Sequence, residues 1–224
     1  MNNDVKTPWK ITALVVLIAL VAIFMSTLLV GAHEFTKSNE TTVFMSGDID
    51  AGATKELKAY LENNKKTDTI ILSSRGGLFA EGIMLGLLFD EKGLTTVVLK
   101  NQYCISSCAF AFLGGKKQAL NGTLAFHRAY TEDKSLGMNE LFGDGQQVGG
   151  FTVWYLIKMG YNSQLAYFIQ AKTSVNTFFV FTDKALLDMM FVSSDDNTPV
   201  SKFLEPTGVS AQWMNDRIKS GGGL

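Results

Sequence analysis

Two adjacent serines and one histidine are the side chains of this chain best suited to chemistry. Ser106 and Ser107 lie where an extended apolar run, Thr95 to Leu99, gives way to a helix-like apolar run, Ala109 to Leu113. A strand-to-helix turn can project a serine hydroxyl into a cleft, and a helix N-terminus favours developing negative charge. His127 is the better placed of the two histidines to act as a base near neutral pH. These residue types indicate nucleophilic acyl chemistry.

Such chemistry also needs donors for the oxyanion. The backbone amides of Gly76 and Gly77 are candidates, because glycine lets the backbone approach a ligand closely. A serine pair beside a single histidine is often incidental, so these residues alone do not establish catalysis.

Composition and motifs limit the other function classes. The 224 residues include 20 basic and 21 acidic side chains, and nucleic-acid recognition usually requires a basic face. The length suits one medium domain, and nothing in the sequence resembles a phosphate-binding P-loop. We therefore expect no nucleic-acid partner, no cofactor and no metal.

A long apolar segment precedes the rest of the chain. Residues 11–31 carry no charged side chain and could cross about 30 Å of hydrocarbon as a helix. A cleaved signal peptide is the alternative, since Val30-Gly31-Ala32 offers small residues for cleavage, but signal-peptide apolar cores usually span only about 7–15 residues. Lys6 and Lys10 place the N-terminus in the cytoplasm. We therefore expect a single-pass membrane protein whose main domain is periplasmic or extracellular.

Apolar periodicity beyond this segment predicts alternating strands and helices. Strands are expected at 42–45, 69–72, 94–99 and 124–126, and helices at 51–63, 79–89, 109–113, 151–161, 164–172 and 185–190. This alternation favours right-handed βαβ units and a mostly parallel sheet. The glycine-rich residues 143–150 are expected to form a flexible loop.

Several segments, in order, resemble the proteolytic subunit of Clp protease in the Clp/crotonase superfamily. They are residues 44–49 (opening strand and turn), 71–77 with 80–82 (strand, Gly-Gly and helix), 104–115 (nucleophile helix), 126–127 (histidine strand) and 182–190 (closing helix). The likeness covers roughly residues 42–195 and is closer to small membrane-anchored or exported relatives with Cys-x-Ser-x-Cys. It implies an α/β fold, a spiral of ββα units with a mostly parallel sheet.

The resemblance divides the chain into five parts. They are a short cytoplasmic N-terminus (1–10), a transmembrane anchor (11–31), a spacer (32–41), the Clp/crotonase-like domain (42–205) and a polar C-terminal tail (206–224). In the family, the region matching Phe151 and Trp154 often packs between subunits, which implies a homo-oligomer. Those side chains are otherwise expected in the core, with Tyr155, Ile157 and Met159.

The family register selects between the two serines. There the nucleophile lies nine residues before the glycine that closes its helix, and counting back from Gly115 gives Ser106. The resemblance further implies that the amides of Gly76 and Ser107 form the oxyanion hole and that His127 is the base. Arg75 replaces the family's proline; we expect it to face solvent, with orientation of a substrate carboxylate as the alternative.

The third member of the family's triad has no acidic counterpart. The family usually places an Asp shortly before its closing Thr, but Ser174-Val175-Asn176-Thr177 stands there. Asn176 could orient His127 through a hydrogen bond, as Asn does in some Cys-His enzymes. A Ser-His dyad is the alternative, and helix capping explains Asp183 better than catalysis. Without a charge behind His127, turnover would be slow.

Cys104 and Cys108 flank the predicted nucleophile. They could be two small buried residues or, in an exported domain, a disulfide. A disulfide needs Cα atoms within about 7 Å, which a turn at Ser106 permits. A metal site is disfavoured because a second pair of ligands is missing, and the family register favours Ser106 over a cysteine nucleophile.

The sequence thus predicts a membrane-anchored serine hydrolase, specifically a peptidase acting on peptide or protein substrates. Two alternatives stay open. One is a catalytically inactive module that binds a peptide or a partner in the same cleft. The other is a crotonase-type acyl-CoA enzyme. This alternative is disfavoured because an exported domain would not normally meet coenzyme A.

Overall fold

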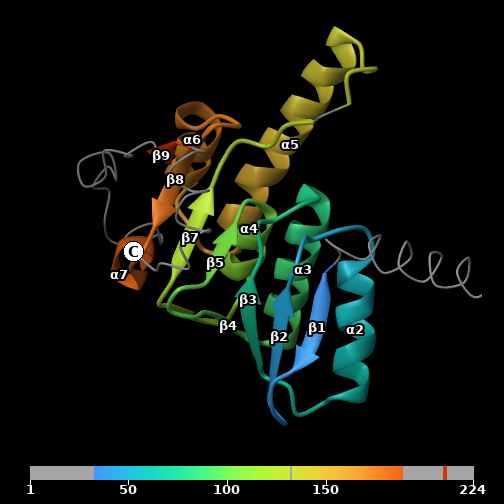
Figure 1. Ribbon diagram of the computed structural model, residues 1–224. Helices are drawn as coiled ribbons and strands as arrows, with labels where there is room; N and C mark the ends of the chain where they lie inside the picture. The colour runs from blue at the N-terminus through green and yellow to red at the C-terminus, as the bar shows by residue number, and fades with distance from the viewer. Residues whose placement is uncertain (1–32, 132, 189–208, 211–224) are drawn as a thin grey trace, which may run out of the picture. The chain divides into compact units, whose positions relative to one another are not determined.

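The computed structural model describes residues 33–131, 133–188 and 209–210 (Figure 1). All of them belong to the unit His33–Leu224. The predicted anchor at 11–31 and the N-terminus at 1–10 lie outside the described residues. Within the described ranges, no helix combines the length and apolarity needed to span a bilayer.

The larger sheet carries the predicted parallel strands. Its order is β1 (Glu34–Lys37), β2 (Thr42–Ser46), β3 (Thr69–Ser73), β4 (Thr95–Val98) and β6 (Lys117–Leu120). Strands β2, β3, β4 and β6 are parallel, and β1 pairs antiparallel with β2. Helices α2 (Ala53–Asn63) and α3 (Phe79–Lys92) connect β2 to β3 and β3 to β4. The predicted α/β fold with a mostly parallel sheet is confirmed.

A second sheet begins beside the C-terminal end of β3. Its order is β5 (Tyr103–Ile105), β7 (Thr123–Phe126), β8 (Thr177–Phe181) and β9 (Val209–Ser210). The backbone of Ser74 joins the two sheets, since its amide donates to Tyr103 (2.9 Å) and its carbonyl accepts from Ile105 (3.0 Å). From β4 to β7 the chain alternates between the sheets, so β5 and β7 end close to the Gly-Gly turn that follows β3.

Helix α4 (Ser107–Leu113) follows β5 and packs backbone to backbone against α3. A Cβ atom on Gly82 would lie 2.3 Å from the Ser107 carbonyl oxygen, and one on Gly114 would lie 2.0 Å from the Gly86 carbonyl oxygen. Glycines at these positions let the two helices approach more closely than side chains would allow. The close contact fixes the helix that directly follows the predicted nucleophile, Ser106.

Helix α5 (Met138–Lys158) contradicts the predicted loop at 143–150, which forms its middle turns. Glycine in a helix costs about 1 kcal/mol relative to alanine, so local propensity alone favours a loop. Two features override it: the Glu140 carboxylate accepts the Gly137 amide at the start (2.8 Å), and Tyr155 and Leu156 are buried near the end. The hydroxyl of Tyr155 also donates to the Phe110 carbonyl (2.8 Å). Anchored at both ends, the glycine-rich turns stay helical.

The described structure also contains short strands in the segments that were predicted to be spacer and tail. Helices α6 (Ser163–Lys172) and α7 (Lys184–Asp188) match the expected helices, but the predicted spacer at 32–41 contains β1, and the predicted tail at 206–224 contains β9. Both are short edge strands, and a neighbouring strand supplies their hydrogen bonds. Phe35 of β1 also packs against the core. Long-range pairing of this kind leaves little trace in a short sequence.

Two matched glycine substitutions test this packing. In Gly86→Ala the new methyl would lie 1.8 Å from the Tyr155 hydroxyl oxygen, so we expect the free energy of unfolding to fall by about 1–3 kcal/mol. In Gly145→Ala, where nothing lies within 4 Å of the new Cβ, we expect it to rise by about 0.5–1 kcal/mol. Urea titration followed by circular dichroism measures both. A destabilised Gly145→Ala protein would show that residues 143–150 are not helical in solution.

Candidate active site

Ser106 occupies a sharp turn between β5 and α4. Its φ of 59° and ψ of −123° lie in a region that residues other than glycine rarely adopt, at a cost of about 1–3 kcal/mol. The Ser106 amide donates to the Ala125 carbonyl of β7 (2.8 Å), and its carbonyl accepts from the Ala109 amide (3.0 Å). Strand and helix therefore hold the turn from both sides.

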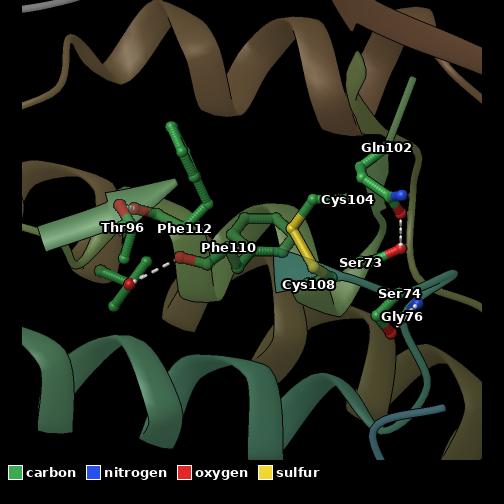
Figure 2. The surroundings of a disulfide bond; sticks show 10 residues. Ser73, Ser74, Gly76, Thr96, Gln102, Cys104, Cys108, Phe110 and Phe112 are labelled. Carbon is green, nitrogen blue, oxygen red and sulfur yellow. Dashed lines mark hydrogen bonds between the residues drawn. A yellow bond between two sulfur atoms is a disulfide. The ribbon is translucent and has the colours of Figure 1, made fainter. Parts of the chain in front are cut away.

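A disulfide between Cys104 and Cys108 closes the chain around this turn (Figure 2). Their Cα atoms lie 5.1 Å apart, and both side chains are fully buried in the core. Cys104 belongs to β5 and Cys108 to the first turn of α4, so the bond links the two elements that flank Ser106. Of the alternatives left open by the sequence, the structure shows the disulfide.

Ser107 differs sharply from its neighbour. Ser107 is 1% exposed and lies against Gly82 of α3, and its hydroxyl has no hydrogen-bond partner among the described residues. Ser106 lines a pocket, whereas Ser107 is not among the lining residues. The environment of the two side chains therefore favours Ser106 as the nucleophile and leaves only the backbone of Ser107 near the site.

The Gly-Gly turn approaches Ser106 closely, but its amides differ from the expected arrangement. A Cβ on Gly76 (φ 101°) would lie 2.6 Å from the Ile105 carbonyl oxygen and 2.7 Å from the Ser106 Cβ, so no larger residue fits. The Gly76 amide, however, donates to the Ser74 hydroxyl (3.0 Å). Gly77, which the family register passes over, lines the pocket. The geometry thus favours Gly77 over Gly76 as an oxyanion donor.

His127 follows β7 and is 9% exposed. Its Nδ1 lies 2.9 Å from the Arg128 carbonyl oxygen. A carbonyl can only accept, so Nδ1 carries a proton, and in the neutral ring Nε2 keeps the lone pair. Burial lowers the pKa of His127 below its ordinary value, although this hydrogen bond partly opposes the shift. The ring is therefore neutral at pH 7, the state that a general base requires.

Asn176 does not reach His127. Its side chain is exposed, and its backbone N–H donates to the Ser174 hydroxyl (3.1 Å) within the turn between α6 and β8. Asparagine is common in turns because it tolerates their backbone conformations. Phe178 instead packs edge-on against the imidazole, with ring centroids 5.0 Å apart. The predicted Ser-His-Asn triad is therefore not assembled, and Phe178 is the neighbour that sequence reasoning missed.

Ser106 and His127 line one pocket of about 530 Å³. Phe79 and Phe110 contribute apolar surface to it, and the other lining residues are Asp48, Ile49, Asp50, Arg75, Gly77, Leu78, Ala129, Tyr130 and Gln170. Arg75 is exposed, as predicted, and lies at this pocket. The two candidate catalytic side chains are not hydrogen-bonded to each other, and such contacts often tighten only when substrate binds.

A neighbouring hollow extends the site. It has a volume of about 540 Å³ and shares Ala129, Tyr130 and Gln170 with the first pocket. Its other side is lined by the first half of α5, including Gly145 and Val148. The two hollows together offer space on both sides of Tyr130, enough for a substrate longer than one residue.

Glu81 of α3 holds the loop that borders the pocket. Its carboxylate accepts the amides of Gly52 (2.9 Å) and Thr54 (3.0 Å) and the Thr54 hydroxyl (2.6 Å). Burial alone would raise the pKa of Glu81, but these hydrogen bonds hold it below its ordinary value. The ionised carboxylate thereby fixes the start of α2, and with it the Asp48–Asp50 segment at the pocket.

Comparison of whole structures identifies the fold. A mutant of ClpP1 from Listeria monocytogenes superposes with a TM-score of 0.51 at 12% sequence identity, over 66% of this chain and 86% of that chain. This chain has the fold of the Clp protease proteolytic subunit. A mutant of 1510-N, a membrane-bound stomatin-specific protease, gives a TM-score of 0.47 at 12% identity, over 75% and 83% of the two chains. No protein-family model and no curated protein matches the sequence.

The sequence resemblance to the Clp protease subunit is thus confirmed for the fold. At 12% identity the likeness carries no information on individual site residues.

Removing the disulfide tests how the Clp fold holds its strained turn. In a Cys104→Ala/Cys108→Ala variant, we expect the free energy of unfolding to fall by about 2 kcal/mol, the chain-entropy estimate for so short a loop. Urea titration measures it, with and without dithiothreitol. The reductant should destabilise the wild type and leave the double variant unchanged. A wild type that dithiothreitol does not affect, and whose thiols alkylate without reduction, would contradict the disulfide.

Proposed function

We propose that this chain is a serine hydrolase that cleaves peptide bonds. The observation that carries the proposal is the strained Ser106 turn, which presents its side chain to the same pocket as the buried, neutral His127. A serine held on a sharp strand-to-helix turn is exposed to substrate and has limited freedom to move. The Clp protease fold supports a peptidase among serine hydrolases.

In the proposed reaction, the Ser106 hydroxyl attacks the peptide carbonyl carbon, and His127 Nε2 takes the hydroxyl proton. The backbone amides of Ser107 and Gly77 bind the oxyanion, while the Gly76 amide keeps Ser74 in place. His127 then returns its proton to the leaving amine, which releases the first product. A water molecule, activated by the same nitrogen, hydrolyses the acyl-enzyme.

The hydrogen bond from His127 Nδ1 to the Arg128 carbonyl takes the place of a carboxylate. It orients the ring and selects the tautomer, which are two of the tasks of the acid in a Ser-His-Asp triad. A neutral carbonyl stabilises the imidazolium less than a carboxylate does. We therefore propose a working but slow Ser-His dyad.

Labelling with a fluorophosphonate probe tests the proposal. We expect the wild type to be labelled, Ser106→Ala to be unlabelled, and His127→Gln to be labelled on the order of 100-fold more slowly, since a positioned base contributes about that much or more. Asn176→Ala is the matched control and should be labelled at the wild-type rate, because its side chain faces solvent. Folded wild-type protein that resists the probe, or equal labelling of Ser106→Ala, would overturn the proposal.

The labelling rate should depend on pH through His127. Because burial lowers the pKa of His127, the rate should rise with pH and reach half its maximum below about 6.5, the ordinary histidine value. The unfolded chain binds more protons than the native chain as pH falls below that value, so acid should also lower the free energy of unfolding. Labelling rates and urea titrations between about pH 4.5 and 8, a range that brackets the ordinary histidine pKa of about 6.5, measure both effects. The His127→Gln protein should lack this contribution; a half-maximum above 7 would contradict the assignment.

A binding module is the second candidate, and one observation favours it. No carboxylate bonds to the His127 ring in the described part of the chain, and Phe178 packs against that ring. In this case the two hollows would hold a peptide or a partner without turnover. A wild type that resists the probe but binds peptides, with affinity lost on filling the two hollows by Ala129→Trp, would support this candidate.

We also propose that residues 11–31 anchor the protein, with the main domain on the periplasmic or extracellular side. The disulfide supports this location, because such bonds persist in oxidising compartments. Exposed Phe151, Trp154 and Ile157 on α5 support a homo-oligomeric contact, whereas Tyr155 of the same group is buried in the core. A peptide or protein substrate remains the expected partner.

A further inference from the structure

Thr173, at the end of α6, reaches the segment that carries His127. Its side chain is buried, and its hydroxyl donates to the Ile169 carbonyl (2.6 Å). This bond fixes the direction of the hydroxyl proton, so the oxygen is left as an acceptor. The Arg128 amide donates to that oxygen (2.7 Å). One buried hydroxyl thus links the last turn of α6 to the residue that follows the histidine.

Arg128 connects this hydroxyl to the imidazole. Its amide bonds to Thr173, and its carbonyl accepts the Nδ1 proton of His127 (2.9 Å). Residues 127–131 belong to no strand or helix, so no ladder of hydrogen bonds holds this stretch. The position of the carbonyl therefore depends on how Arg128 is tethered, and the hydroxyl of Thr173 supplies a tether.

The same turn also supplies the ring contact on His127. Phe178, five residues after Thr173, packs edge-on against the imidazole, and Phe179 stacks on Phe168 of α6. The turn itself is closed by Ser174 and Thr177, whose hydroxyl accepts the Ser174 amide (2.8 Å). Helix α6, the turn and β8 thus form one continuous, packed segment beside His127. Thr173 sets the hydrogen bond of the ring, and Phe178 sets its packing.

We infer that Thr173 is a positioning residue for His127, acting through the backbone of Arg128. It keeps the carbonyl where Nδ1 must donate, so that the lone pair of Nε2 is available to Ser106. When Nε2 takes the serine proton, Nδ1 keeps its own, and neither the carbonyl nor the threonine changes protonation. The inference rests on the proposed function, because positioning matters only if His127 is a base.

The variant Thr173→Val keeps the shape of the side chain and removes the hydroxyl. Thr173→Ser restores the hydroxyl. The matched control is Thr177→Val, which removes a hydroxyl from the same turn without touching Arg128. Thr173→Ala makes the same deletion with less volume and replaces the valine variant if that protein does not fold.

The first readout is the tautomer of His127, from ¹⁵N NMR of the full chain with labelled histidine at pH 8, a value roughly 1.5 above the ordinary histidine pKa. With two histidines in the chain, a His33→Gln protein assigns the signals. We expect the Nδ1-protonated tautomer in the wild type, Thr173→Ser and Thr177→Val. We expect mixed tautomers in Thr173→Val.

The second readout is the rate of fluorophosphonate labelling across the pH range. We expect Thr173→Val to be labelled roughly 10- to 100-fold more slowly, by analogy with the loss of a partner that orients a metal-binding histidine. Thr173→Ser should recover most of the rate, and Thr177→Val should keep it. In Thr173→Val, we expect a lower maximal labelling rate at high pH, where His127 is neutral. The midpoint of the pH profile should change little.

These readouts separate the inference from the proposed function. An unchanged tautomer and rate in Thr173→Val would overturn the inference and leave the hydrolase proposal standing. Equal losses in Thr173→Val and Thr177→Val would also overturn it, because the effect would then belong to the turn as a whole. The His127 tautomer could change in Thr173→Val although the probe labels no form of the protein. That result would support the link from Thr173 to His127 and overturn the serine hydrolase proposal.

Discussion

The backbone contact between α3 and α4 is the constraint on which the candidate site depends. A Cβ at Gly82 on α3 would lie against the backbone of Ser107, and one at Gly114 after α4 would lie against the backbone of Gly86, so the two helices meet along their main chains. Helix α4 begins directly after Ser106, and α3 begins directly after the Gly-Gly turn and Leu78. One helix pair therefore sets the distance between the candidate nucleophile and the candidate oxyanion donors. A larger residue at Gly82 would push against Ser107 itself.

Strain at Ser106 is tolerable because covalent and hydrogen-bonded links surround it. An unfavourable backbone region costs about 1–3 kcal/mol, while the loop closed by Cys104 and Cys108 contributes about 2 kcal/mol by chain entropy. The bond from the Ser106 amide to Ala125 adds a further restraint. These two free energies are of similar size, so the short disulfide offsets the cost of the backbone conformation that turns Ser106 toward the pocket. A cysteine pair two residues before and two after the strained position is well placed for this role.

The sequence supports the local parts of this arrangement better than the long-range parts. Apolar periodicity predicts β2, β3, β4, β7 and helices α2, α3 and α4, but not the short strands β5 and β6. The choice of Ser106 and His127, which line one pocket, came from the resemblance to the Clp protease subunit. The sequence predicts a loop for the glycine-rich turns of α5, because the contacts that hold this helix are long-range. They come from the Phe110 carbonyl and from the core around Tyr155. Asn176 was misplaced because turn residues and catalytic amides look alike in sequence. Phe178 was missed because nothing local shows that β8 pairs with the strand that ends at His127.

An oriented histidine does not require a carboxylate, and the hydrogen bonds around His127 show why. Orientation and tautomer need only an acceptor at a fixed position, which the Arg128 carbonyl provides. Charge stabilisation of the imidazolium does need an acid, and Phe178 places an apolar ring beside the histidine instead. Burial then lowers the pKa of His127, which keeps the base available at neutral pH but makes its protonated form harder to reach. The described site therefore has the histidine orientation of a catalytic triad but lacks the negative charge that would stabilise the imidazolium. In the proposed Ser-His dyad, the cost of forming the imidazolium, rather than the placement of Ser106, would limit the rate.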